Sequence, residues 1–137
     1  MIPSAAATSL SAAERALYHQ VRPIKLATDF STAAASLVLL AQHRLWVALA
    51  VMWIPSIVVS VWLMRVGDFS VTRASPVGAY LRRHMTSAMQ GVRFLGLAAA
   101  AIGAWLHAWA LVPVGALVIG WGWAGGWVSE RLRARLR

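Results

Sequence analysis

Two long apolar blocks on either side of a polar middle segment dominate the chain. The first covers residues 24–64 and contains only three charged residues, Lys25, Asp29 and Arg44. The second covers residues 94–129 and contains no Asp, Glu, Lys or Arg. One helix over these 36 residues would be about 54 Å long, whereas the hydrocarbon core of a bilayer is about 30 Å thick. Each block therefore predicts two membrane-spanning helices.

Polar residues and a proline mark the expected turn inside each block. Residues 42–44 (Gln-His-Arg) are the one polar cluster in the middle of the first block. In the second block the turn is expected at residues 107–113, because Pro113 is suited to the first turn of a helix. The predicted spans are residues 24–42, 45–65, 91–108 and 112–129.

Two polar segments outside the blocks predict amphipathic helices at the membrane interface. Ser11 and Glu14 have the spacing of a capping box, and the helix that follows is expected to end near Arg22. A second helix is expected to begin at Ser75 and Pro76. Its apolar positions recur at helical spacing: Val77, Leu81, Met85 or Ala88, and Val92. Both segments are typical of helices that lie on an anionic membrane surface.

The pattern as a whole predicts an all-α integral membrane protein, a bundle of four transmembrane helices made of two hairpins. Residues 1–137 are expected to form one membrane domain. Its parts are a cytoplasmic N-terminal segment (1–23), a first hairpin (24–65), a basic cytoplasmic loop (66–90), a second hairpin (91–129) and a basic tail (130–137).

Composition and charge support this class and orient it. Of all residues 60% are hydrophobic and 12% are charged, which excludes an ordinary water-soluble domain and a disordered chain. The 13 Lys and Arg outnumber the 4 Asp and Glu, giving a net charge of +9. With four spans, Arg44 lies on one side of the membrane and every other basic residue on the opposite side. Because basic residues accumulate in cytoplasmic loops, both termini are expected in the cytoplasm, and the bacterial inner membrane is the expected location.

The expected partner of this basic surface is the anionic headgroup layer of the bilayer and not a nucleic acid. Arginine binds phosphate through a planar fork of donors. The arginines expected at headgroups are Arg15, Arg22, Arg82, Arg83, Arg93, Arg131 and Arg133.

No residue pattern indicates catalysis or a cofactor. The absence of cysteine excludes disulfides, thiolate metal sites and cysteine nucleophiles. No histidine spacing typical of a metal site occurs, and neither a phosphate-binding loop nor a nucleophile elbow is present. We therefore predict no catalytic residue, metal or cofactor.

Asp29 is the most unusual residue, because a carboxylate inside an apolar span is energetically costly. Lys25 lies one helical turn before it, so the two residues are either an ion pair that fixes helix depth or part of an ion- or solute-binding site. Small hydroxyl residues on the first two spans form either helix contacts or a polar path. They are Thr32, Ser36, Ser56 and Ser60.

Glycines on the last two spans predict close helix packing, within the bundle or between copies. They are Gly96, Gly103, Gly115, Gly122 and Gly126. A weak internal repeat is also possible. His43 and His107 occupy the two expected turns, and Tyr18 with His19, and Tyr80 with His84, precede the two hairpins.

Three functions are compatible with these features. The first is a non-enzymatic accessory or scaffold subunit of a larger membrane assembly. The alternative is a homo-oligomeric transporter or channel for an ion or small solute, using the polar face of the first two spans. The third is an enzyme acting on a lipid at the cytoplasmic interface, with His19, Lys25, Asp29, Arg82, Arg83 and His84 converging.

Overall fold

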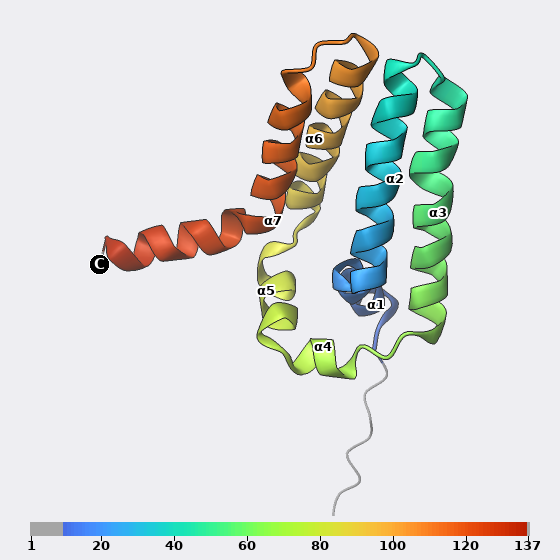
Figure 1. The fold of residues 1–137 in the computed structure, drawn as a ribbon. Helices are drawn as coiled ribbons and strands as arrows, with labels where there is room; N and C mark the ends of the chain where they lie inside the picture. The colour runs from blue at the N-terminus through green and yellow to red at the C-terminus, as the bar shows by residue number, and fades with distance from the viewer. Residues whose placement is uncertain (1–9, 137) are drawn as a thin grey trace, which may run out of the picture.

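The computed structural model describes residues 10–136, and all regular structure in this range is helical (Figure 1). The prediction of an all-α protein is therefore confirmed. The elements in chain order are α1 (Ala12–Tyr18), the 3-10 helix η1 (His19–Val21), α2 (Pro23–Ala41), α3 (Leu45–Val66), α4 (Ser70–Ala74), α5 (Pro76–His84), α6 (Ser87–Trp105) and α7 (Leu111–Arg135).

Four of these helices, α2, α3, α6 and α7, are long and apolar enough to cross a membrane. The first two match the predicted spans closely. The third does not, because α6 both begins and ends earlier than the predicted 91–108. Thr86 explains the early start, since its side chain accepts a hydrogen bond from the Met89 N–H and caps α6. The fourth helix continues past the predicted end at residue 129 to Arg135.

The long helices pack in two pairs, α2 with α3 and α6 with α7, and α2 also contacts α6. Below, the first pair is α2 with α3 and the second pair is α6 with α7. Figure 1 shows the short turns of both pairs at the same end of the molecule. The turns also meet through side chains, because the ring centroids of His43 and His107 are 5.3 Å apart.

Both turns use the same backbone device. His43 has a φ of 57° and His107 a φ of 56°, the left-handed conformation that commonly ends a helix. In the first turn the Arg44 N–H donates to the Leu39 carbonyl, which uses one of the carbonyl groups left unpaired at the end of α2. Neither position is a glycine, so each histidine accepts a conformation that side chains disfavour.

The other end of the bundle is covered by the short helices α1, α4 and α5. Their core contains Tyr18 and Phe69, both fully buried, with Leu81 and Met85 packed beside them. The predicted capping box is present: the Ser11 side chain accepts from the Glu14 N–H, and the Glu14 carboxylate accepts from the Ser11 N–H. The capping box fixes the first turn of α1, while the buried Tyr18 and the bond from Arg15 to the Met64 carbonyl hold α1 against the rest of the chain.

The second predicted surface helix is wrong in its extent. The apolar periodicity continues across residues 85–86, but α5 ends at His84, and Ala88 and Val92 belong to α6. The predicted start is correct, since the Ser75 side chain accepts from the Gly78 N–H and Pro76 opens the helix. The short α4 was not predicted.

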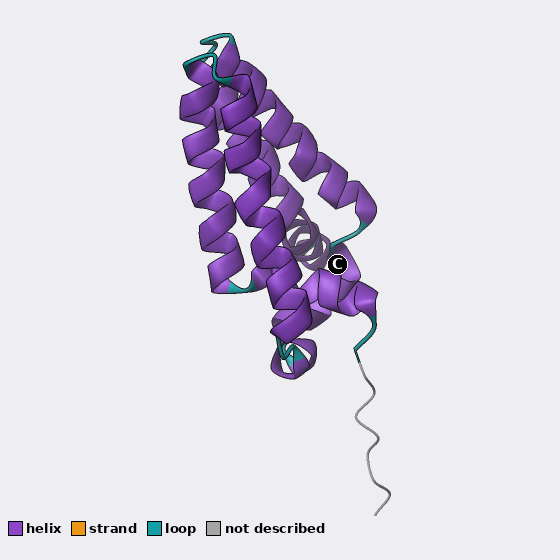
Figure 2. Cartoon of the chain, turned by 90° about the vertical axis from the view of Figure 1, so that its right-hand side faces the viewer, coloured by secondary structure: helices purple, strands orange, loops and turns teal. Residues whose placement is uncertain are grey.

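Helix α7 changes direction in its glycine-rich middle, so that its C-terminal part runs away from the bundle (Figure 1). Figure 2, a view from the side, shows the loops of the described chain at the ends of the helices, with both short turns together. At the end of the bundle away from the short turns, α7 therefore no longer runs beside α6 (Figure 1). The candidate site lies towards this end, between the two helix pairs.

Candidate functional site

The centre of the site is a polar network that joins α2 to α3. Lys25 Nζ donates to Asp29 Oδ1 at 2.6 Å and to Ser56 Oγ at 2.5 Å. Ser56 Oγ in turn donates to the same Asp29 oxygen at 2.8 Å. Three residues predicted as binding residues from the sequence therefore form one closed network.

Burial of this network is unequal. The Lys25 side chain is only 7% exposed, whereas the Asp29 side chain is 39% exposed. The buried ammonium depends on Asp29 and Ser56 for its compensation, since an unpaired buried charge is strongly destabilising. The more open carboxylate keeps part of its surface available to a ligand. Through Ser56 the ion pair also links α2 to α3.

Asp29 lines a cavity of about 420 Å³ that lies between the two helix pairs. Residues of η1, α2, α3, α6 and α7 form its wall. Of the six predicted binding residues, Lys25, Asp29, Thr32, Ser56 and Ser60 line it. Ser36 does not, because it is fully buried and donates to the Ala48 carbonyl at 3.0 Å, a contact between α2 and α3.

Arg93 on α6 supplies a second cation on the opposite wall. Its guanidinium donates to Gln20 Oε1 at 3.1 Å and lies over the Trp123 ring, 4.1 Å from the ring centroid. Within residues 10–136, no Asp or Glu oxygen lies within ion-pair distance of Arg93. The sequence assigned Arg93 to lipid headgroups, so its place in the wall of this cavity was missed.

A sequence signal for Arg93 did exist. The same number of residues separates Pro23 from Ser87, Asp29 from Arg93, and His43 from His107, and α2 and α6 are both 19 residues long. The possible repeat therefore aligns the one acid of the first span with a base on the third. Opposite charges at equivalent positions of two packed helices would be expected to face a common space.

His19 is the remaining titratable group of the wall. It is 8% exposed, and its Nδ1 lies 3.3 Å from the Arg15 carbonyl. Burial lowers the pKa of His19 below its ordinary value, and the nearby Lys25 charge acts in the same direction. At neutral pH the cavity therefore holds two cations, one anion and a neutral imidazole.

The other arginines predicted at headgroups mostly have partners within the chain. Arg15 donates to the Met64 carbonyl at 3.0 Å, Arg22 donates to the Asp68 carbonyl, and Arg82 donates to the Tyr18 hydroxyl. Arg83 pairs with Glu130 at 3.0 Å, and Arg131 lies over the Trp127 ring. Arg133 is exposed. Headgroup binding by this set stays a prediction.

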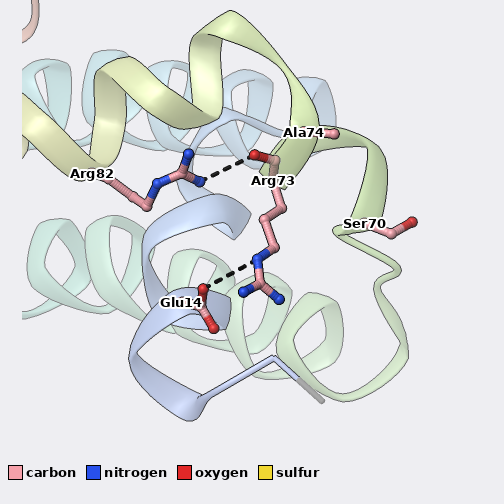
Figure 3. A pocket seen from close by; sticks show the side chains of 5 residues that line it. All are labelled: Glu14, Ser70, Arg73, Ala74 and Arg82. Atoms are coloured by element: carbon pink, nitrogen blue, oxygen red, sulfur yellow. Dashed lines mark hydrogen bonds and ion pairs between the residues drawn. The ribbon is translucent and has the colours of Figure 1, made fainter. Parts of the chain in front are cut away.

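A second pocket, of about 500 Å³, lies at the surface near α1, α4 and α5 (Figure 3). Arg73 Nε is 3.5 Å from Glu14 Oε1, and Arg82 donates to the Arg73 carbonyl at 3.1 Å. The pKa of Glu14 is lowered, chiefly by the hydrogen bond from the Ser11 N–H. Figure 3 shows Glu14 and Arg82 both directed at Arg73, so these groups mainly hold α1 against the loop.

All five glycines predicted at packing faces contact the chain itself. A Cβ at Gly96 would lie 2.7 Å from the Gly115 carbonyl oxygen, and one at Gly103 would lie 2.6 Å from Leu111 Cβ. Gly122 faces Arg93 and Gly126 faces His84. The glycines thus join α6 to α7 and to the segments beside them.

In the part of the chain that the structure describes, no three His, Asp or Glu residues gather in a way that would hold a metal ion. No family model, no curated protein and no solved structure matches this chain. The class of the protein therefore follows from its own helices: it is an integral membrane protein with four candidate spans.

Proposed function

We propose that this protein is a small membrane transporter that binds its solute in the cavity between the two helix pairs. The observation that supports this function is the network of Lys25, Asp29 and Ser56 at one wall, opposite Arg93. Buried charge in a membrane span is costly, and such groups typically mark a solute or ion pathway. The network gives the cavity both a carboxylate and cations with which to hold a polar group.

One of the sequence features that favoured an accessory subunit no longer does so. Part of its sequence evidence was the glycine faces, which were expected to pack within the bundle or between copies. Gly96 and Gly115 meet each other, and Gly122 and Gly126 meet Arg93 and His84. The enzyme function has less support still. His19, Lys25 and Asp29 line the central cavity, Arg82 lines the surface pocket, and His84 bonds to Glu130.

We further propose the arrangement predicted from the sequence: two membrane hairpins, α1 and α5 at the interface, and both termini in the cytoplasm of a bacterial inner membrane. Single cysteines at Gln42 and Ser70 test the orientation, and the chain contains no other thiol. A membrane-impermeant reagent should label Gln42→Cys from the periplasmic side and Ser70→Cys from the cytoplasmic side. Labelling of both from one side would contradict a membrane crossing by α3, which lies between the two positions.

Access to the cavity tests the transport function. Ser60 lines the cavity, and its hydroxyl bonds only to the Ser56 carbonyl of its own helix, so Ser60→Cys should leave the network intact. A transporter exposes its site to each side in turn. An uncharged, impermeant maleimide should therefore modify Ser60→Cys in vesicles of either orientation.

Val58→Cys is the matched control. Val58 lies on the same helix but is 60% exposed on the outside of the bundle, where lipid would surround it. It should not react, because a thiolate does not form in hydrocarbon. Modification of Ser60→Cys from one side only would contradict transport, and no modification from either side would contradict a solute-accessible cavity altogether.

A further inference from the structure

Beside the central cavity lies a second, almost wholly apolar cavity of about 400 Å³. The two share four lining residues, Met52, Trp53, Phe94 and Leu97. Below, these two cavities together are called the groove. The polar end of the groove is the cavity at Lys25 and Arg93, and the apolar end is the cavity towards the helix turns. The apolar end runs to Leu45 on α3 and to Trp105 and Leu106 at the end of α6.

The polar end carries one net positive charge. Lys25 and Arg93 contribute two cations and Asp29 one anion, while burial favours the neutral form of His19. Lys25 is already shared between Asp29 and Ser56. Among the described residues Arg93 forms no close ion pair: its contacts are with neutral groups, the Gln20 amide, the Met85 sulfur and the Trp123 ring, and the Asp29 charge acts on it from a longer distance. A guanidinium with such partners complements an anionic oxygen group, which it binds in a bidentate manner.

The apolar end has the length of a hydrocarbon chain. From Phe94 to Leu106 the groove follows α6 for about 18 Å, at about 1.5 Å per helical residue. Leucines, alanines and aromatic rings form this part of the wall, so water inside it would have almost no hydrogen-bond partners. A ligand that filled both ends would therefore need a charged head and a long apolar tail.

The side of the groove is open towards the region that lipid would occupy. Phe30 and Phe94, which line the polar end from α2 and α6, are 68% and 57% exposed. Trp53, shared by both ends, is 43% exposed. A molecule already in the bilayer reaches the groove between these side chains without first crossing the aqueous phase.

We propose that the groove holds one acyl chain of an anionic membrane lipid, with the lipid phosphate bound at Arg93. The inference rests on the proposed transport function, for which it names the substrate class. Charge complementarity at the polar end and the length of the apolar end both favour this occupant. The carboxylate of Asp29 excludes a second anionic group, so the headgroup carries a single negative charge.

Lipid retention during purification tests the occupant. The full-length protein is purified from membranes of equal phosphatidylglycerol and phosphatidylcholine content, and the lipids that remain bound are measured by mass spectrometry. Phosphatidylglycerol should be retained in preference to phosphatidylcholine. Arg93→Gln should lower that preference about tenfold, because it removes one charge-assisted pair with the phosphate.

Arg65→Gln is the control, because Arg65 is an exposed arginine in the last turn of α3, does not line the groove and is not among the arginines predicted at headgroups. It should keep the preference. A second variant tests the apolar end independently of Arg93. Ala101 lines only that end, so Ala101→Trp should reduce retention of long-chain phosphatidylglycerol and leave binding of the dihexanoyl form unchanged.

Four results would overturn the proposal: equal retention of both lipids by the wild type, equal effects of Arg93→Gln and Arg65→Gln, no effect of Ala101→Trp, or displacement of the lipid by inorganic phosphate alone. The last result would assign the site to a free anion. These outcomes are separate from the cysteine experiment on Ser60. Failure of two-sided labelling with normal lipid retention removes transport and leaves a lipid-binding protein.

Discussion

The two helix pairs have the same outline but are held together by opposite means. Each consists of a first helix of 19 residues, a turn with a histidine in the left-handed conformation, and a returning helix. The first pair is joined by polar groups: Lys25 and Asp29 meet Ser56, and Ser36 meets the Ala48 carbonyl. The second pair is joined by backbone, with Gly96 against Gly115.

This difference explains where the cavity has its chemistry. Gly96 and Gly115 bring the backbones of α6 and α7 together. Arg93 of α6 lies against Gly122 and the Trp123 ring of α7 and also lines the space between the pairs. The first pair places its charges at its own interface, and Asp29 extends from that interface into the cavity. The second pair thus contributes a single cation to the wall of the cavity, and the first pair contributes the polar network.

The largest expected effect is on the backbone contact of the second pair. Gly96→Leu should destabilise the protein by about 3 kcal/mol or more, because the new side chain would meet the Gly115 carbonyl, which cannot move without separating the helices. Thermal unfolding in detergent, followed by circular dichroism, measures the change. Gly120→Leu is the control: nothing lies within 4 Å of a Cβ at Gly120, so its stability should change little.

The next effect is on the ion pair of the first pair of helices. Asp29→Asn should cost about 2 kcal/mol, because it leaves the buried Lys25 ammonium without a full counter-charge while the site keeps some access to water. The double variant Lys25→Met with Asp29→Leu should recover most of this loss. If the loss of unfolding free energy in the double variant equals the sum of the losses in its single variants, the two residues are not coupled. The network would then not be what holds α2 to α3.

A smaller effect is expected for a single hydroxyl group. Ser36→Ala should cost about 1 kcal/mol, because the buried Ala48 carbonyl loses a donor on the neighbouring helix. Ser60→Ala should be nearly neutral, since the Ser60 hydroxyl bonds only within its own helix. Equal values for the two would show that the contact between helices adds nothing to an ordinary serine in a span.

The smallest effect concerns pH. Burial lowers the pKa of His19, so between that lowered value and 6.5 the unfolded chain binds more protons than the folded one. Stability should therefore fall as the pH is lowered through this interval and level off below it. His19→Gln should remove this part of the pH dependence, as measured by unfolding midpoints across the interval. A wild-type midpoint that rises on acidification there would contradict a buried neutral imidazole.

The sequence predicted the helical class and most of the long helices, because span length and charge distribution are properties of short continuous segments. The ion pair was also predictable from the sequence, since Lys25 and Asp29 are one turn apart on one helix. The helix break at residues 85–86 was not, because apolar periodicity continued through it and only the Thr86 cap marks the new start. Local patterns identify a helix more readily than they locate its ends.

The contacts between the residues of the site depend on tertiary structure and could not be predicted from the sequence. Ser36 and Ser56 were given the same two alternatives, a helix contact or part of a polar path, yet Ser56 closes the network and Ser36 is a buried contact. Both are serines in apolar helices, so nothing in their immediate sequence separates them. Arg93 was assigned to headgroups for the same reason: its approach to Trp123 and Gln20 joins segments distant in the chain.

Charge selectivity inside the cavity tests the central claim most directly. Ser60→Cys is treated in proteoliposomes with two methanethiosulfonates of similar size, one carrying a sulfonate and one a trimethylammonium group, with each rate divided by that for a free thiol. An accessible cavity with one excess cation predicts faster reaction with the sulfonate, and loss of that preference in Arg93→Gln. Reaction with neither reagent, or faster reaction with the cation, would contradict the account.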